Sequence, residues 1–171
     1  MRLERLSKKS ITNTYEILGN ITFVFTAKRE RFVIDTEMLY EVEKFSWCVG
    51  KTGYLVANIR NRVVKLQRYL LEVDDREIAV DHINGDRMDN RLCNLRKCTR
   101  RENSYNAKVL PSQLGITGVR RTENGKYRAE ICHNFKNIYL GRFNTLEEAI
   151  KVRQEAELKY FGEFAPHLRN A

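Results

Sequence analysis

The stretch from Ile78 to Lys108 constrains the fold most, because it is polar, rich in asparagine and arginine, and poor in large apolar side chains. A segment of this composition rarely builds a core of its own. It is therefore expected to wrap around an ion or a chemical site, while packed cores form from the chain on either side. With 171 residues, the chain is long enough for two or three small compact units.

The chain before this stretch is expected to form a small α+β body. Five short segments are rich in β-branched and aromatic residues and are separated by turn residues, which is typical of strands. The expected strands are 15–18, 21–25, 31–35, 54–57 and 62–66. Apolar residues at helical spacing predict a short helix from Thr36 to Phe45, and Leu66 to Val73 is a second candidate.

The chain after this stretch is predicted to form a three-stranded antiparallel sheet packed on one helix. Residues 126–132 alternate between polar and apolar side chains, as a half-buried strand does. Asn124-Gly125 before them indicates a hairpin turn, and residues 136–143 supply a further strand. Thr145 to Glu148 has the spacing of a capping box that opens a helix, and Gly162 is expected to end that helix.

The net charge points to a polyanionic partner. Lysine and arginine number 31 against 22 aspartates and glutamates, so the formal charge is +9, which suits double-stranded DNA. Basic residues also cluster locally without an acidic residue among them: Arg91, Arg96, Lys97, Arg100 and Arg101. A solvated basic surface is the alternative that charge alone leaves open.

The apolar runs and the cysteines set further expectations. No apolar run approaches the roughly 18 residues of a membrane-spanning helix, and residues 1–5 are not followed by the apolar region of a secretion signal. We therefore expect a cytoplasmic protein, in a bacterial or phage-infected cell, with neither a membrane nor a protein partner. The cysteines include no Cys-x-x-Cys pair and are expected to be reduced and mostly buried: Cys48, Cys93, Cys98 and Cys132.

Asp81 and His82 place a carboxylate and an imidazole side by side at the end of a predicted strand. Thr99 and Glu102 have capping-box spacing, which predicts that a helix carrying Asn103 starts there. Hydrolysis of a phosphodiester needs an activated water and a hard cation. An imidazole can take the proton of that water, and Mg²⁺ needs only one or two protein oxygens beside the substrate phosphate. His82 is thus the candidate general base, and Asp81 and Asn103 are candidate ligands.

Residues 81–86, 89–91, 94–95 and 101–103 together resemble the HNH motif of phage-type and intron-encoded homing endonucleases. The resemblance implies a ββα-metal finger that binds one divalent ion, Mg²⁺ or Mn²⁺, and cuts double-stranded DNA. It implies that His82 is the general base, that Asp81 and Asn103 are the metal ligands, and that Asn94 braces the loop and orients the histidine. The chain departs from this pattern at Gln67, where many relatives carry a histidine, and at Asn103, which replaces the last histidine of the motif.

A second resemblance covers the C-terminal part. Residues 118–121, 125–131, 139–143, 145–149 and 160–165 are similar to an AP2 DNA-binding domain. This implies that the sheet face turned away from the helix contacts DNA. The resemblance places Arg120, Glu130 and Tyr139 at positions that contact DNA. Strand pattern and charge add further expected contacts, Arg121, Lys126, Arg128 and Arg142, although a solvated sheet face is the alternative on pattern alone.

The expected organisation is an HNH endonuclease domain over residues 1–108, a linker over 109–114 and an AP2-like domain over 115–171. The HNH domain divides into an α+β body, 1–77, and the finger, 78–108. The expected function is a metal-dependent, site-directed endonuclease of homing type. A non-catalytic, sequence-specific regulator with a degenerate HNH fold is the main alternative, suggested by Gln67. An RNA-binding module is disfavoured, because stacking motifs for single strands are missing.

Overall fold

The computed structural model describes residues 13–105, 114 and 116–170. The chain divides into two compact units, each discontinuous in sequence. The N-terminal unit comprises Met1–Arg76 and Asp86–Arg96, and the C-terminal unit comprises Glu77–Gly85 and Lys97–Ala171. Most of the expected linker, 109–113, lies outside the described residues. The expected domain boundaries stay predictions.

The N-terminal unit contains two small antiparallel sheets. The first has the order β1-β2-β3 and the second β4-β5-β6. The strands are β1 (Thr14–Leu18), β2 (Ile21–Phe25), β3 (Arg31–Asp35), β4 (Cys48–Val49), β5 (Leu55–Ile59) and β6 (Arg62–Lys65), followed by helix α2 (Leu66–Leu70). The five predicted strands are confirmed, with small shifts at their ends. The two-residue strand β4 is an addition that the sequence does not predict.

The helix predicted over residues 36–45 is wrong at its C-terminal end. A 3₁₀ turn, η1 (Thr36–Met38), leads into the short helix α1 (Leu39–Val42). At the end of this helix, the Val42 carbonyl accepts from the indole Nε1 of Trp47 at 2.8 Å and from the Phe45 N–H at 3.3 Å. Trp47 is itself fully buried, so the packing of one aromatic ring overrides the helical pattern of the sequence.

The C-terminal unit begins with Glu77–Gly85 and resumes at Lys97, so it includes the first strand of the predicted chemistry and the end of the second. Strands β7 (Ile78–His82) and β8 (Leu95–Thr99) form a two-stranded sheet, and α3 (Arg100–Tyr105) follows β8 directly. The predicted capping box is confirmed. The Glu102 carboxylate accepts from the Thr99 backbone N–H at 2.8 Å, and the Glu102 N–H donates to Thr99 Oγ1 at 3.2 Å.

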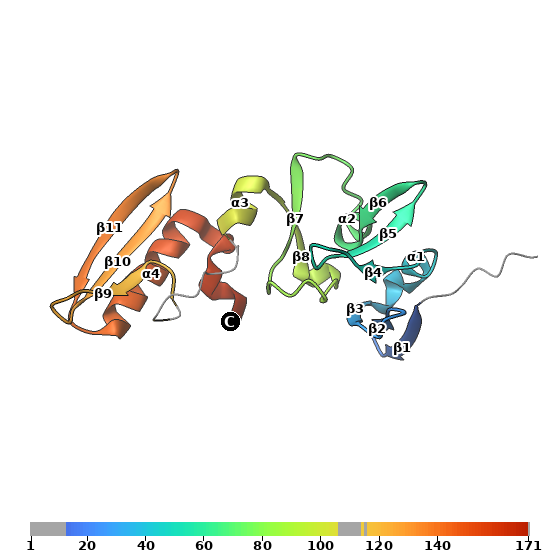
Figure 1. Ribbon diagram of the computed structural model, residues 1–171, viewed down its shortest axis with the longest axis horizontal. Helices are drawn as coiled ribbons and strands as arrows, with labels where there is room; N and C mark the ends of the chain where they lie inside the picture. Colours follow the sequence, from blue (N-terminus) through green and yellow to red (C-terminus); the bar gives the residue numbers. More distant parts are fainter. Residues whose placement is uncertain (1–12, 106–113, 115, 171) are drawn as a thin grey trace, which may run out of the picture. The chain divides into compact units, whose positions relative to one another are not determined.

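The rest of this unit is the predicted sheet with its helix. Strands β9 (Val119–Arg121), β10 (Tyr127–His133) and β11 (Lys136–Phe143) form an antiparallel sheet of order β11-β10-β9. Helix α4 (Leu146–Phe161) covers one face (Figure 1), and Val119, Ala129 and Ala149 form the core between them. The mixed α+β fold is therefore confirmed. Both capping-box bonds of Thr145 and Glu148 are present, and Gly162 caps the helix with a φ of +56°.

Aromatic rings connect α3 to the end of this helix. The ring of Tyr105 stacks on Phe161 with 4.3 Å between centroids, and His133 lies 6.0 Å from Tyr105 and 5.1 Å from Tyr160. Two 3₁₀ turns, η3 (Gly162–Phe164) and η4 (Pro166–Asn170), complete the unit. The six-residue helix α3 is thus packed on side chains far away in sequence.

The expectation that the cysteines are mostly buried is wrong. Cys98 is buried, but Cys48, Cys93 and Cys132 are exposed. Cys132 shows the reason, because it stands opposite Asn137 on the sheet face that α4 does not cover. Among the described residues, none of the helices combines the length and the apolar character that crossing a membrane requires.

Candidate metal site and DNA-contacting surface

Asp81 and His82 form the end of β7, and both side chains are buried, with exposed fractions of 8% and 4%. Both side chains interact with other groups of the protein. The chain turns directly after them. The Gly85 N–H donates to the His82 carbonyl at 2.9 Å, and Gly85 has a φ of +73°, a conformation that favours glycine. The turn fixes the end of the strand.

Asn103 is carried by another element, the helix α3. It lies half-buried on α3, and α3 packs against β7 within the C-terminal unit. One carboxylate, one imidazole and one amide are thereby carried by two neighbouring elements. Carboxylate and amide oxygens suit a hard divalent cation. The described residues include no group of three or more His, Cys, Asp and Glu side chains placed to hold a metal ion.

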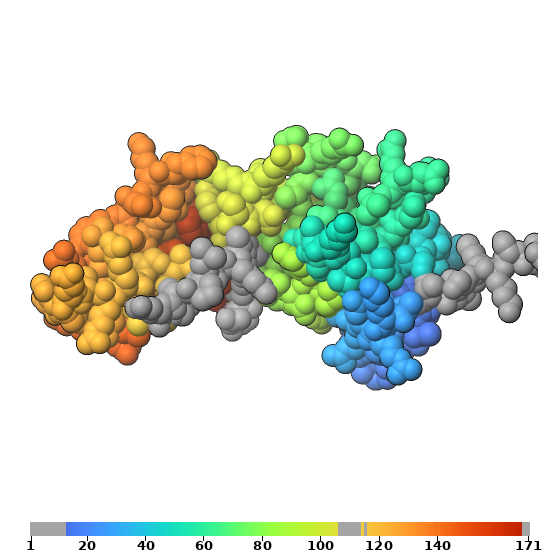
Figure 2. All heavy atoms as spheres, viewed as in Figure 1, coloured from blue at the N-terminus to red at the C-terminus, as the bar shows by residue number. Residues whose placement is uncertain are grey.

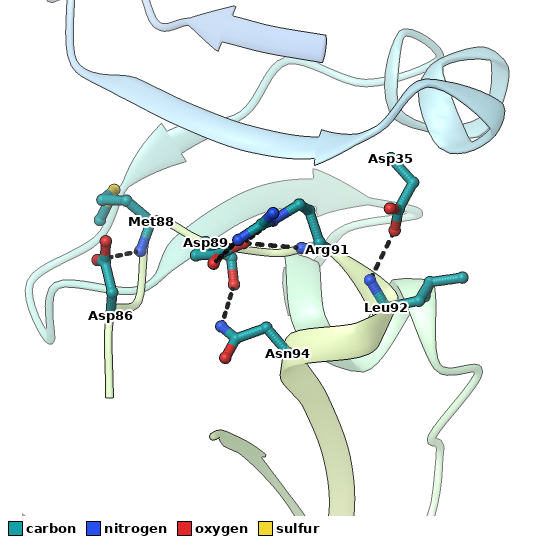
Figure 3. A network of polar contacts seen from close by, with 7 residues as sticks. All are labelled: Asp35, Asp86, Met88, Asp89, Arg91, Leu92 and Asn94. Carbon is teal, nitrogen blue, oxygen red and sulfur yellow. Dashed lines mark hydrogen bonds and ion pairs between the residues drawn. The ribbon is translucent and has the colours of Figure 1, made fainter. Parts of the chain in front are cut away.

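Asn94 lies in the loop that precedes β8 (Figure 3). This loop belongs to the N-terminal unit. Its side chain is buried, and its Nδ2 donates to the Asp89 carbonyl at 2.7 Å. The contact closes the short 3₁₀ turn η2 (Leu92–Asn94) onto the preceding residues. Asn94 therefore stabilises the loop in which it lies.

The same loop is pinned to strand β3. The Leu92 N–H donates to the Asp35 carboxylate at 2.6 Å, as Figure 3 shows. The Val33 N–H donates to the Met88 carbonyl at 2.9 Å, and the Asn90 N–H donates to the Val33 carbonyl at 2.9 Å. This irregular polar segment has no core of its own, and these hydrogen bonds hold it in one conformation.

The Arg91 guanidinium is hydrogen-bonded to a carboxylate of the same loop. Its Nε and Nη2 donate to the two carboxylate oxygens of Asp89 at 2.8 and 2.7 Å. The hydrogen bond to Asp89 raises the pKa of the Arg91 guanidinium above its usual range. Because the Asp89 side chain is almost fully buried, the pair is a structural element of the loop.

The basic run predicted to contact DNA is divided between the two units. Arg91 and Arg96 belong to the N-terminal unit, and Lys97, Arg100 and Arg101 belong to the C-terminal unit. Arg100 lies 3.2 Å from the Glu77 carboxylate, and Arg101 Nε donates to the Tyr105 hydroxyl at 2.6 Å. Lys97, Arg100 and Arg101 are exposed.

Comparison with known proteins assigns the segment that contains these residues. Residues 72–105 match the family described as HNH endonuclease. An uncharacterized HNH endonuclease of Acanthamoeba polyphaga mimivirus is 30% identical over 129 residues, which cover 72% of this chain and 67% of the relative. The chain belongs to the HNH endonuclease family. A search of solved structures gave no match.

In this HNH protein, the second candidate surface is the sheet face that α4 leaves uncovered. Arg120 and Arg142 both stand opposite Arg128, from β9 and β11 respectively. Glu130 lies next to them, with its carboxylate 3.1 Å from Arg128 and 3.7 Å from Arg120. The Arg128 guanidinium lies over the Tyr139 ring at 5.2 Å. We call Arg120, Arg128, Glu130, Tyr139 and Arg142 the arginine face.

A β-bulge makes this arrangement possible. Tyr139 and Arg142 are three residues apart, so a regular strand would turn them to opposite faces. The register shifts between Ala129 and Glu130, which leaves Leu140 as the extra residue on β11. Gly141, with a φ of +141°, accommodates the irregularity. Tyr139 and Arg142 therefore share one face.

Two further expected contacts lie at the ends of strands. Lys126 is exposed in the turn before β10. Arg121 stands opposite Tyr127, on the side of the sheet that α4 covers, although its side chain is exposed. Arg121 is therefore separated from the arginine face by the alternation of β9.

Gln67, the departure from the HNH pattern, lies on α2 in the N-terminal unit. It is buried, and its Oε1 finds no hydrogen-bond partner among the described residues. An unpaired buried oxygen of this kind costs on the order of 1–3 kcal/mol. The sequence marks the position as unusual but gives no sign that the oxygen is unpaired.

A groove in the N-terminal unit was missed by the sequence reasoning. It is lined by residues between Ile59 and Arg76, which include four basic residues, Arg62, Lys65, Arg68 and Arg76, and two acidic ones, Glu72 and Asp74. Burial, together with the positive charges of Arg68 and Arg87, lowers the pKa of Lys65. The spacing of Arg62, Lys65 and Arg68 is the one sequence signal that could have indicated a shared basic surface.

Proposed function

We propose that the chain is a divalent-metal-dependent endonuclease that hydrolyses phosphodiester bonds in double-stranded DNA. One observation carries the proposal: β7 ends in adjacent Asp81 and His82, and α3, which bears Asn103, packs against that strand. Membership of the HNH endonuclease family supports a nuclease acting on DNA. In this proposal Asp81, His82 and Asn103 would provide the base and the two oxygen ligands that phosphodiester hydrolysis requires of the protein.

Each residue has a chemical role in this proposal. His82 accepts the proton of the attacking water, because an imidazole is the side chain best suited to proton transfer near neutral pH. The oxygens of Asp81 and Asn103 would hold a single Mg²⁺ or Mn²⁺, which neutralises charge on the phosphate when bound. Asn94 braces the loop before β8 through its bond to the Asp89 carbonyl.

The C-terminal sheet is proposed to bind the duplex in the manner of an AP2 domain. A three-stranded sheet can enter the major groove, where alternating side chains reach the base edges. The arginine face presents three guanidiniums on the side of the sheet opposite α4. With Lys126, Lys97, Arg100 and Arg101 added as phosphate contacts, binding is expected to weaken steeply with salt. A site-directed enzyme of homing type, acting in the cytoplasm, is the biological role that we propose.

One observation favours a second function, a DNA-binding regulator that no longer cuts. The Oε1 of Gln67 has no hydrogen-bond partner among the described residues, and the resemblance to the HNH motif implies a histidine at this position. Such a protein would keep the DNA-contacting surface and lose the hydrolytic step. The two functions differ in whether the phosphodiester bond is broken.

The test is nicking of supercoiled plasmid with and without Mg²⁺ or Mn²⁺. We expect metal-dependent nicking by the native chain and a loss of at least about a hundredfold in His82→Ala, because general-base catalysis typically contributes that much or more. Asp81→Ala and Asn103→Ala are expected to lose nicking as well. Ser104→Ala is the matched control, because Ser104 is exposed and is next to Asn103 on the same helix.

DNA affinity, measured by gel shift on the same variants, separates the two functions. Retained affinity with lost nicking supports the endonuclease. Binding by the native chain without cleavage of plasmid, or of duplexes selected from a random library, under either metal would establish the regulator instead. Equal loss in Ser104→Ala and Asn103→Ala would show that α3 matters only for folding.

A further inference from the structure

The turn that joins β10 to β11 is unusual in its backbone conformation. Its two central residues, Asn134 and Phe135, have φ angles of +53° and +60°. Two-residue hairpin turns of this kind favour Asn followed by Gly, because both positions lie in the left-handed region. Asparagine suits its position, whereas a phenylalanine in the left-handed region is strained.

The side chain of Phe135 adds a second cost. Its exposed fraction is 104%, the highest among the exposed large apolar residues of the described chain. A glycine at this position would relieve the strain and remove the exposed ring. The turn is therefore poorly suited to the stability of the free protein, and it suits a contact that forms only when a partner binds.

The turn continues the arginine face. Side chains alternate along β10, so Cys132 lies on the same face as Arg128 and Glu130. Asn137 stands opposite Cys132, at the last pair but one before the turn. Lys136 is exposed directly after Phe135, but it stands opposite His133 and so belongs to the other side of the sheet. The hairpin end stands out at the surface of its unit, in orange in Figure 2.

We propose that Phe135 is a contact residue of the DNA surface, placing its ring against the base edges of a bound duplex. The inference rests on the proposed function, because it needs DNA on the arginine face. Positive charge on that face selects a polyanion, and an aromatic ring at its end adds an apolar contact. Phenylalanine fills this role against thymine methyl groups or between base steps.

The experiment compares Phe135→Gly, Phe135→Asn and Phe135→Trp in the full chain. Both Gly and Asn tolerate the left-handed backbone without supplying a ring. The probe is an AT-rich duplex with 2-aminopurine at alternate adenines, and affinity is measured by fluorescence anisotropy at fixed salt. We expect about a tenfold loss of affinity in the Gly and Asn variants, at an unchanged or higher melting temperature. The Trp variant should keep the native affinity.

A matched control is Leu158→Ala, which removes an exposed apolar side chain from α4 and should leave the affinity unchanged. Native affinity in Phe135→Gly, within twofold, overturns the inference and leaves the endonuclease proposal intact. A dimer, seen by sedimentation equilibrium and lost only in the Phe135 variants without a change in DNA affinity, also overturns it in favour of a second copy of the chain. Absence of duplex binding by the native chain overturns both the inference and the proposed DNA surface.

Discussion

Two regions of the molecule carry arginines, and they use them in opposite ways. In the loop Asp86–Arg96, Arg91 is bound by both oxygens of Asp89, a carboxylate whose side chain is only 7% exposed. On the arginine face, Arg120 and Arg128 share Glu130, whose side chain is 26% exposed, and Arg120 is itself 60% exposed. The first arginine is part of the folded structure, and the second group remains available to a ligand.

In these two regions, an arginine is structural when its acidic partner is buried and is available to a ligand when that partner is exposed. The density of charge in the sequence does not distinguish the two cases. A buried carboxylate needs its counter-charge, so removing the arginine leaves an unpaired buried charge. An exposed pair contributes little to stability, and its arginines can exchange a carboxylate for a phosphate. The following variants test this distinction, from the largest expected effect to the smallest.

The largest effect is expected when the positive charges of the arginine face are removed. Replacing Arg120, Arg128 and Arg142 together by alanine removes three positive charges opposite one another on the sheet. We expect roughly a hundredfold loss of DNA affinity at low salt and a shallower dependence of log Kd on log salt, by about 0.9 for each phosphate that the variant no longer neutralises. Anisotropy titrations at several salt concentrations provide the measurement. An unchanged salt slope would mean that these arginines do not reach phosphate.

The next effect concerns Arg91 and is one of stability. Arg91→Ala leaves the buried Asp89 carboxylate without its bidentate partner, and we expect the free energy of unfolding to fall by about 2 kcal/mol. This loss is smaller than that for a fully buried ion pair, because the Arg91 side chain is partly exposed. Urea denaturation measures it. DNA affinity of the folded variant should stay within about twofold of the native value. A large loss of affinity at native stability would place Arg91 on the DNA surface and remove the distinction between the two regions.

The smallest effect is expected at Glu130. Glu130→Gln removes the carboxylate shared by Arg120 and Arg128. Because the pair is partly exposed, the free energy of unfolding should change by less than about 0.5 kcal/mol. Affinity for duplexes of arbitrary sequence should rise a few-fold, since two guanidiniums lose their internal counter-charge. A fall in affinity would indicate that Glu130 itself accepts a hydrogen bond from a base.

Much of the fold could be predicted because local signals agree with the final structure. Alternation in residues 126–132 predicts the strand that buries Ala129 and Ile131, and the capping boxes at Thr99 and Thr145 predict the starts of α3 and α4. These signals act over a few residues, and no distant contact overrides them. The position of Asp81 and His82 at the end of a strand follows from the same local reasoning.

The rest depends on contacts between residues distant in sequence. The polar composition of Ile78–Lys108 does not by itself indicate the strand β8, which only the resemblance to a ββα finger implied; pairing with β7 makes Leu95–Thr99 a strand. Asn94 is predicted as a brace, but its partner, the Asp89 carbonyl, becomes visible only in the folded loop. The bulge that turns Arg142 outward is equally invisible, because strict alternation places it opposite to Tyr139.

The stacking of Tyr105 on Phe161 has a consequence for any shortened form of the protein. A six-residue helix has too few internal hydrogen bonds to persist in water without packing. If the chain were cut after residue 108, the Tyr105 ring would lose the aromatic surface that covers it, and α3 would fray from its C-terminal end. Asn103 lies two residues from that end. The isolated segment 78–108 would then keep Asp81 and His82 on their strand while the position of Asn103 became variable, so the proposed metal site depends on packing from the C-terminal helix α4.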